Sequence, residues 1–319
     1  MHSGDVGDFT AAAAVGKTAA WAFDGVAKPT AWARNGSSWT QVPFPNQAAG
    51  EEVIAAGATS PTDVWAFTLS AIWSRVLHWN GRTWTVEIQF RRQIGGAAVI
   101  SPSDVWVFGQ PFIPGSGLGA WHYNGKAWSQ VPSGQGLEGG SALSADDVWA
   151  FDGASIAHWN GQTWSRTSLA NLLPARQALN GPMLTGVYAE SPTSVYAIGN
   201  GNLEDEGGPT VILHYNGHSW SKVAEGNYGY GTQPLQQISS DGHGGLWIPA
   251  PGVDGRPSSL LHYLSGKLTK VALPVPASKI DVESVALIPG TTDLLAGGFT
   301  HAASNQNANV VSVILQYGT

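Results

Sequence analysis

The 319-residue sequence predicts an all-β fold built from a repeated unit, and three observations lead to this prediction. One phrase of similar residues returns along nearly the whole chain at intervals of 41 to 51 residues. Each interval has room for four short strands joined by turn residues. Twelve of the 15 tryptophans fall at equivalent positions of these units. A unit of 40–50 residues that holds about four strands is typical of the blade of a β-propeller.

The repeated phrase is an Asp with an apolar-aromatic run, then His-aromatic-Asn-Gly, and a Trp three residues after that Gly. The clearest copies are Asp63-Val64-Trp65 with His78-Trp79-Asn80-Gly81 and Trp84, Asp104-Val105-Trp106 with His122-Tyr123-Asn124-Gly125 and Trp128, and Asp147-Val148-Trp149 with His158-Trp159-Asn160-Gly161 and Trp164. Looser copies are anchored at Trp21, Tyr196, Trp247 and Leu295. The seven anchors predict a seven-bladed β-propeller of four-stranded antiparallel blades.

The clearest unit divides into strands at 53–59, 64–67, 76–79 and 83–88. Ser60-Pro61-Thr62-Asp63 is a turn sequence, and Asn80-Gly81 is a typical hairpin dipeptide. The second strand is apolar at consecutive positions, which indicates burial on both faces. We therefore expect Trp65, Trp106 and Trp149 to be buried between neighbouring blades.

The last unit ends after its third strand, which would leave an unpaired sheet edge. The segment from His2 to Phe9 precedes the first unit and is the natural donor of the missing strand. The expected architecture is one domain over residues 1–319, a ring closed by the N-terminal strand. Two separate all-β domains are the competing interpretation, and the even period without a linker disfavours it.

The repeated phrase resembles that of β-propellers in bacterial, actinobacterial-type secreted and envelope proteins. This resemblance covers nearly the whole chain and implies a binding module that lies outside the cytoplasm, although a cytoplasmic location stays open. Kelch and sialidase-type propellers share the architecture but not this phrase, so no catalytic residue is carried over from them.

Composition excludes several kinds of site and partner. The formal net charge of −7 is unsuited to a nucleic-acid surface. No apolar run is long enough to span a membrane, so no membrane insertion is expected. The absence of cysteine excludes disulfides, thiolate catalysis and cysteine-ligated metal sites. We expect a monomer.

The repeated histidines and aspartates are interpreted as structural. His78, His122, His158, His214 and His262 occupy one equivalent position in five units, so they are spread among the blades and cannot converge on one ion. We expect each to hydrogen-bond inside its own blade. The repeated Asp at 63, 104 and 147 is expected to accept hydrogen bonds from backbone N–H groups of its turn.

Ligand-binding residues are expected on the loops that differ between units, because a repeated scaffold carries its function on variable loops. These loops join the second strand to the third, and the fourth strand to the next unit. The candidates are Trp73, Phe112, Arg91, Arg92, Asp152, Tyr228, Tyr230 and Asp254. Glu204, Asp205 and Glu206 are weak candidates for a Ca²⁺ site, since the usual spacing of a calcium loop is absent. No other cofactor is expected.

Two functions are compatible with these residues. The first is a non-enzymatic recognition module that binds a glycan or a protein through the variable loops. The alternative is a propeller-fold hydrolase or lyase acting on a saccharide or small metabolite at the central opening. No nucleophile elbow, zinc motif or phosphate loop is present, so catalytic residues are unknown.

Overall fold

Antiparallel β-strands make up nearly all of the regular secondary structure of the described residues. The computed structural model describes residues 2–4, 9–24, 29–45, 50–109, 117–174, 183–200, 209–226, 238–250, 259–271, 280–300 and 311–317. A short 3₁₀ helix, η1 (Ala170–Leu172), interrupts them. In this part of the chain no helix has the length and hydropathy needed to cross a membrane. The contacts divide the chain into two units, residues 1–91, 239–262 and 270–319, and residues 92–238 and 263–269. The single domain over residues 1–319 stays a prediction.

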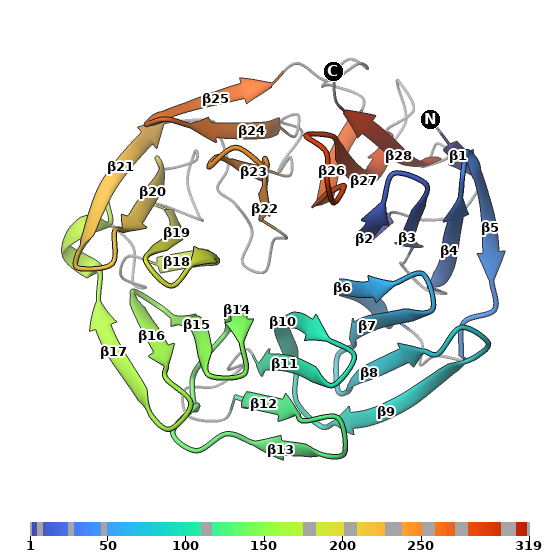
Figure 1. Cartoon of the computed structure of the whole chain (residues 1–319), viewed down its shortest axis with the longest axis horizontal. Helices are drawn as coiled ribbons and strands as arrows, with labels where there is room; N and C mark the ends of the chain where they lie inside the picture. Colours follow the sequence, from blue (N-terminus) through green and yellow to red (C-terminus); the bar gives the residue numbers. More distant parts are fainter. Residues whose placement is uncertain are drawn as a thin grey trace. The chain divides into compact units, whose positions relative to one another are not determined.

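The first unit contains three regular four-stranded sheets (Figure 1). One sheet consists of β2 (Phe9–Gly16), β3 (Ala19–Asp24), β4 (Thr30–Asn35) and β5 (Ser38–Val42). The next consists of β6 (Glu52–Ser60), β7 (Asp63–Leu69), β8 (Ser74–Trp79) and β9 (Trp84–Phe90). The third consists of β26 (Ile280–Leu287), β27 (Leu294–Thr300), β28 (Val311–Tyr317) and β1 (His2–Gly4).

The second unit contains three further regular sheets. They are β10 (Ile94–Ser101), β11 (Asp104–Gly109), β12 (Gly119–Tyr123) and β13 (Trp128–Gln130); β14 (Gly139–Ser144), β15 (Asp147–Asp152), β16 (Ser155–Trp159) and β17 (Trp164–Ser168); and β18 (Met183–Ser191), β19 (Ser194–Asn200), β20 (Thr210–Tyr215) and β21 (Trp220–Gly226). In each sheet, strands that follow one another in sequence are hydrogen-bonded neighbours.

The predicted count of seven full blades needs correction to six regular blades and one reduced sheet. In the reduced sheet, β22 (Ser239–Ser240), β23 (Leu246–Ala250), β24 (Ser259–Leu264) and β25 (Lys267–Val271) follow one another, but the first strand has two residues and pairs only with Leu246 and Trp247. Strand β22 pairs with its neighbour at two residues, whereas β6 and β18 each pair at seven, so the first strand of this unit lacks most of the ladder of a full blade.

The N-terminal segment completes the sheet of β26–β28. His2 pairs with Ile314, Ser3 with Val313 and Gly4 with Ser312 in an antiparallel ladder. Strand β1 therefore takes the outer position that β28 would otherwise leave open, as the truncated last unit predicts.

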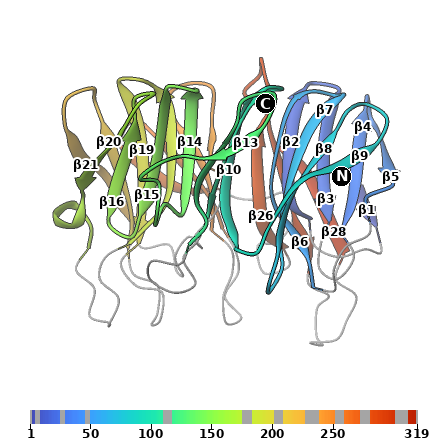
Figure 2. The ribbon, with the colours of Figure 1, turned by 90° about the horizontal axis from the view of Figure 1, so that it is seen from below.

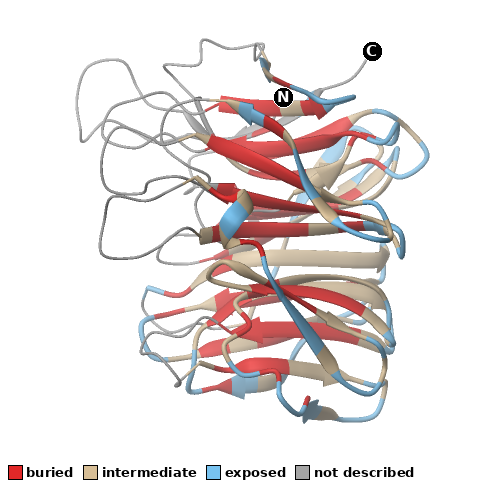
Figure 3. Ribbon diagram, turned by 90° about the vertical axis from the view of Figure 1, so that its left-hand side faces the viewer, coloured by how far each residue is buried: buried red, intermediate tan, exposed pale blue. Residues whose placement is uncertain are grey.

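Burial follows the order of the strands within a blade (Figure 3). The second strand is buried along almost its whole length, whereas the outer strands β5 and β17 are mostly exposed. Trp65, Trp106 and Trp149 are 0%, 1% and 5% exposed, so the prediction that they are buried is confirmed. Trp106 packs against Val148 and Ala150 of the next blade, which shows how these rings fill the space between sheets.

The five repeated histidines hydrogen-bond within their own sheets, as predicted. In four of them the Nε2 atom contacts a carboxylate oxygen: His78 with Asp63 at 2.6 Å, His122 with Asp104 at 2.8 Å, His158 with Asp147 at 2.9 Å and His262 with Asp241 at 2.8 Å. In the fifth, the Nε2 atom of His214 contacts the Ser194 hydroxyl at 2.9 Å. Each imidazole also stacks on the aromatic ring of its second strand, with centroids 4.1–4.5 Å apart.

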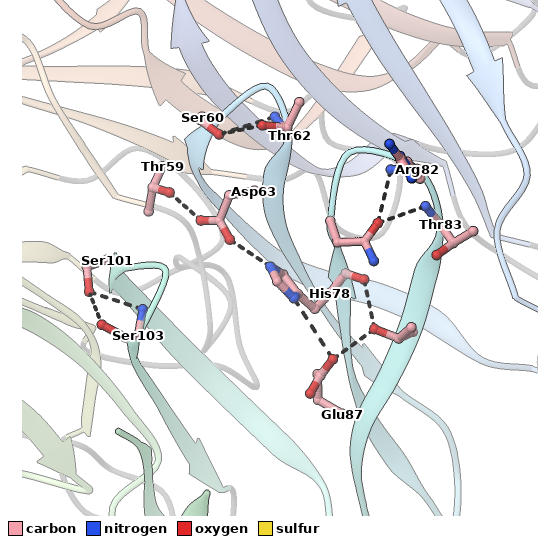
Figure 4. A network of polar contacts seen from close by, with 12 residues as sticks. Thr59, Ser60, Thr62, Asp63, His78, Arg82, Thr83, Glu87, Ser101 and Ser103 are labelled. Atoms are coloured by element: carbon pink, nitrogen blue, oxygen red, sulfur yellow. Dashed lines mark hydrogen bonds and ion pairs between the residues drawn. The ribbon is translucent and has the colours of Figure 1, made fainter. Parts of the chain in front are cut away.

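The prediction for the repeated aspartates named the wrong hydrogen-bond donor. Their carboxylates accept a hydrogen bond from a histidine ring rather than from the backbone of the turn, and Asp63 also accepts one from the Thr59 hydroxyl (Figure 4). The reason is the register, because Trp65 on β7 lies opposite His78 on β8 and the imidazole over that ring reaches the start of β7.

The Asn-Gly turns between the third and fourth strands are closed by the asparagine side chain. The Asn80 Oδ1 atom accepts hydrogen bonds from the backbone N–H of Arg82 and Thr83, both at 3.0 Å (Figure 4). Gly81 has φ = +90°, a backbone conformation that favours glycine. The same arrangement recurs at Asn124, Asn160 and Asn216.

Candidate functional site

A tight turn joins β7 to β8, two strands that run side by side with β9 in Figure 2, and it presents Ile72 and Trp73. The Ser70 hydroxyl donates to the Trp73 carbonyl at 2.8 Å and accepts from the Trp73 N–H at 3.0 Å. The Ser70 N–H donates to the same carbonyl at 2.8 Å. Three hydrogen bonds between the same two residues therefore fix the turn.

Arg91 covers the indole of Trp73. Its guanidinium carbon lies 4.8 Å from the centroid of the Trp73 ring, within the range of a cation–π interaction. Arg91 directly follows β9, whose last residue, Phe90, is buried and so anchors this end of the strand. The structure thus brings together two candidates that lie 18 positions apart in the sequence.

Ile72 is the most exposed large apolar side chain among the described residues, at 66%. It lies in the turn next to Trp73, so one short segment combines an exposed aliphatic side chain, an indole and a guanidinium. We refer to Ile72, Trp73 and Arg91 as the Trp73 surface. Arg92, the next residue, is also exposed and adds a second guanidinium.

A buried ion pair lies at the base of the same blade. Arg75 donates from Nε and Nη2 to the two carboxylate oxygens of Glu51, each at 2.7 Å. The Thr68 hydroxyl donates to Glu51 as well, and the Arg75 N–H donates to the Thr68 hydroxyl at 3.1 Å. A two-point arginine–carboxylate contact fixes both side chains, so the strands that carry the Ser70–Trp73 turn are tied together just before and after it.

Asp152 lies at the end of β15 and forms an ion pair with Arg166 of the outer strand β17. Arg166 also donates to the carbonyl of Gln135 at 2.8 Å. Partial burial lowers the pKa of the Arg166 guanidinium. Asp152 is therefore engaged within its own sheet and belongs to a different blade from the Trp73 surface.

Sequence reasoning missed Glu51 and Glu138. Glu138 immediately precedes β14, and burial raises the pKa of its carboxyl, an effect that a hydrogen bond with the backbone of Gly153 partly offsets. The run Gly50-Glu51-Glu52 could have drawn attention to Glu51, because it directly precedes a predicted strand of the unit that also contains Arg75. Nothing in the local sequence distinguishes Glu138 from an ordinary surface carboxylate.

The remaining candidates lie outside the described residues: Phe112, Tyr228, Tyr230, Asp254, and the Glu204, Asp205 and Glu206 of the expected calcium loop. Within the described ranges, no three His, Asp or Glu side chains are grouped closely enough to hold a metal ion. Both the loop aromatics and the calcium site stay predictions.

No protein-family model and no curated protein matches the chain. Among solved structures, it is similar to YCF48 bound to a D1 peptide, with a TM-score of 0.62, 12% identity, and coverage of 100% of this chain and 96% of that one. The WD40 β-propeller domain of Doa1 gives a TM-score of 0.61 at 12% identity, covering 97% and 93%. The GH74 enzyme of Niastella koreensis gives 0.61 at 13% identity, covering 94% and 53%.

These likenesses show the fold, a β-propeller of four-stranded antiparallel blades. At 12–13% sequence identity they show the fold alone and support no statement about function. One of these structures is a peptide complex and another is an enzyme, and one fold can serve unrelated functions. The function of this chain has to be argued from its own residues.

Proposed function

We propose that the protein is a non-enzymatic recognition module that binds a segment of another protein through the Trp73 surface. The observation that carries the proposal is the exposure of Ile72, at 66%, beside an indole that a guanidinium already covers. Aromatic residues and arginine are the residue types that contribute most to protein–protein binding energy. An exposed aliphatic side chain next to them offers apolar area that a partner can bury.

The rigidity of the turn supports the proposal. A binding surface loses affinity when its side chains must be ordered on association. The three hydrogen bonds of Ser70 and the Glu51–Arg75 ion pair hold the Trp73 surface in place before a partner arrives. Little conformational entropy then has to be lost on binding.

The charge around the surface defines the partner's chemistry. Arg91 and Arg92 are exposed side by side in a protein whose formal net charge is −7. A segment with an apolar side chain for Ile72 and Trp73, and a carboxylate for the guanidiniums, would match this surface. YCF48, whose structure is similar to this fold, was solved bound to a D1 peptide and is a precedent for peptide binding.

Selection from a phage-displayed library of random peptides tests the proposal. Peptides enriched on the wild-type protein should contain an aliphatic residue near an acidic one. Trp73→Ala and Ile72→Asp should each weaken binding of the best peptide about fivefold or more, because truncating a central contact costs about 1–3 kcal/mol.

Val86→Asp is the matched control, since Val86 is a 43% exposed apolar residue on β9 of the same blade but outside the surface. It should leave peptide affinity unchanged. Equal peptide affinity of the wild type, Trp73→Ala and Ile72→Asp would contradict the proposal. Binding of a glycan on an array, at a level that these two substitutions do not change, would contradict it as well.

The other expected contacts extend the same proposal. We propose that Phe112, Tyr228, Tyr230 and Asp254 also contribute to ligand binding, and that the protein acts as a monomer outside the cytoplasm. The ground for the location is the resemblance to bacterial secreted propellers. Size-exclusion chromatography with light scattering and detection of the native protein in cell fractions test these two points.

The alternative, a hydrolase or lyase, has one observation in its favour. A carboxyl with a raised pKa, that of Glu138, can serve as a general acid. A panel of chromogenic glycosides tests it, and turnover that Glu138→Gln abolishes would replace the binding proposal.

A further inference from the structure

A groove of about 520 Å³ lies between two neighbouring blades of the second unit. One side is the sheet of β14–β17, and the other is the turn between β20 and β21. The segment after β17, which includes η1, borders one end of it. This volume is within the range of about 300–1,000 Å³ that small-molecule sites occupy.

Aromatic rings form one part of the groove. Trp149 lies at its base, with the Tyr215 ring 5.2 Å and the Trp220 ring 6.1 Å from it, centroid to centroid. Tyr215 and Trp220 also contact each other at 5.5 Å, and the Tyr215 hydroxyl donates to the Gly217 carbonyl at 2.9 Å. These contacts fix the rings, so the groove offers a preformed aromatic surface.

Polar side chains form another part of the groove, beside the apolar Ile156, Leu169 and Leu172. Ser165 and Thr167 alternate on the outer strand β17 and therefore share one face, and Asn171 and Ser219 border the groove from the two loops. Among the described residues, the side chains of Thr167, Asn171 and Ser219 have no hydrogen-bond partner. The groove thus has a row of donors and acceptors open to a ligand.

The lining contains no carboxylate, ammonium or guanidinium group, and its titratable side chains are the imidazoles of His158, which is hydrogen-bonded to Asp147, and of His218. An anionic or cationic ligand would find no permanently charged group of opposite sign there. A neutral molecule with an apolar C–H face and many hydroxyl groups matches both the aromatic rings and the polar row. That combination is characteristic of a pyranose.

We propose that this groove binds a neutral saccharide. The Tyr215 and Trp220 rings contact the C–H face of the sugar, and Thr167, Asn171 and Ser219 exchange hydrogen bonds with its hydroxyls. The site is separate from the Trp73 surface, which lies in another blade and in the other unit of the chain. Saccharide binding in the groove and protein binding at the Trp73 surface can therefore be tested separately.

The test uses the full chain and a panel of neutral sugars: methyl glucoside, methyl galactoside, N-acetylglucosamine, cellobiose and maltose. Saturation-transfer NMR identifies binders, and calorimetry measures their affinity. At least one sugar should bind, and Ser165→Trp, which places an indole in the groove, should weaken it about tenfold or more. Asn171→Ala should weaken it severalfold through the loss of hydrogen bonds.

Thr85→Trp is the matched control. Thr85 on β9 and Ser165 on β17 hold equivalent positions, since each hydroxyl donates to the carbonyl of the histidine on its third strand, at 3.3 and 3.4 Å. Thr85→Trp should bind sugar as the wild type does, and both variants should keep the wild-type circular dichroism spectrum.

Three results would overturn the inference. These are no saturation transfer to any sugar of the panel, equal affinity for wild type and Ser165→Trp, and an equal loss in both tryptophan variants. An uncharged extended peptide that binds where no sugar does, and that Ser165→Trp excludes, would identify β17 as an edge for strand addition instead. Trp73→Ala should leave sugar binding intact, which separates this test from that of the proposed function.

Discussion

Replacing Trp106 by alanine tests the packing between blades directly. The side chain is 1% exposed and packs with Phe108, Val148 and Ala150 as part of a core shared by two sheets. Its ring also stacks on His122 at a centroid distance of 4.5 Å. Trp106→Ala therefore removes contacts in two blades and leaves the imidazole without its aromatic neighbour.

The magnitude follows from the buried area. A buried aromatic side chain removes about 150–250 Å² from water, and about 25 cal/mol per Å² gives about 4–6 kcal/mol. Measured truncations of large core aromatics cost about 3–5 kcal/mol. We therefore expect Trp106→Ala to lower the free energy of unfolding by about 4 kcal/mol.

The assay is urea unfolding followed by circular dichroism, with hydrogen exchange to locate the loss in residues 92–238. Trp128→Ala is the control, because Trp128 lies on the outer strand of the same blade and is only partly buried. It should cost about 1–2 kcal/mol. A loss below about 2 kcal/mol for Trp106→Ala, or equal losses for the two variants, would refute the role given to the second-strand tryptophans.

Four further predictions follow from the polar contacts and the chain ends. Burial lowers the pKa of His214, although Glu190 opposes the effect, so Ser194→Asp should raise that pKa in an NMR titration by restoring the carboxylate of the other blades; an unchanged pKa would contradict this. Burial raises the pKa of the Glu138 carboxyl, so its ionisation costs folding stability; Glu138→Gln should therefore stabilise the protein in urea unfolding at pH 7, and this gain should shrink as the pH falls through the raised pKa and be gone below the ordinary value of about 4.5. Glu51→Gln should cost about 3–5 kcal/mol in urea unfolding, because it leaves a buried guanidinium without its countercharge; a neutral result would show that water replaces the carboxylate. Removing residues 1–8 should speed hydrogen exchange in β28, and unchanged protection there would show that β1 contributes nothing.

The sequence predicted the blades because their pattern is local. The apolar run after Asp63, the Asn80-Gly81 turn and the tryptophan spacing each specify strands that pair with their neighbours in the chain. The reduced sheet was not predicted, since Trp247 and His262 keep the spacing of a blade while the strand before them shrinks to Ser239–Ser240. The anchor residues predict that a unit is present, but they do not predict the length of its first strand.

The candidate site was predictable only in part. Trp73 was recognisable as an aromatic residue that no repeat requires, and Arg91 as a charge in a variable loop. Their contact depends on how two loops of one blade converge, and the burial of Glu51 depends on tertiary packing that no local pattern encodes. The groove beside Trp220 was not predicted, because its aromatic residues occupy repeat positions and were interpreted as structural.

The pairing of β1 with β28 has a consequence for how the protein is made. Within the six regular blades every other strand pair joins neighbours in the chain, so these pairs can form soon after their residues leave the ribosome. His2 and Ile314, by contrast, are separated by almost the whole chain. Their ladder must wait until synthesis has reached β28, and it then closes the longest loop of the molecule, at the largest entropic cost. The order of synthesis is therefore also the order of assembly, and the sheet that joins the first strand to the last is the final one to form.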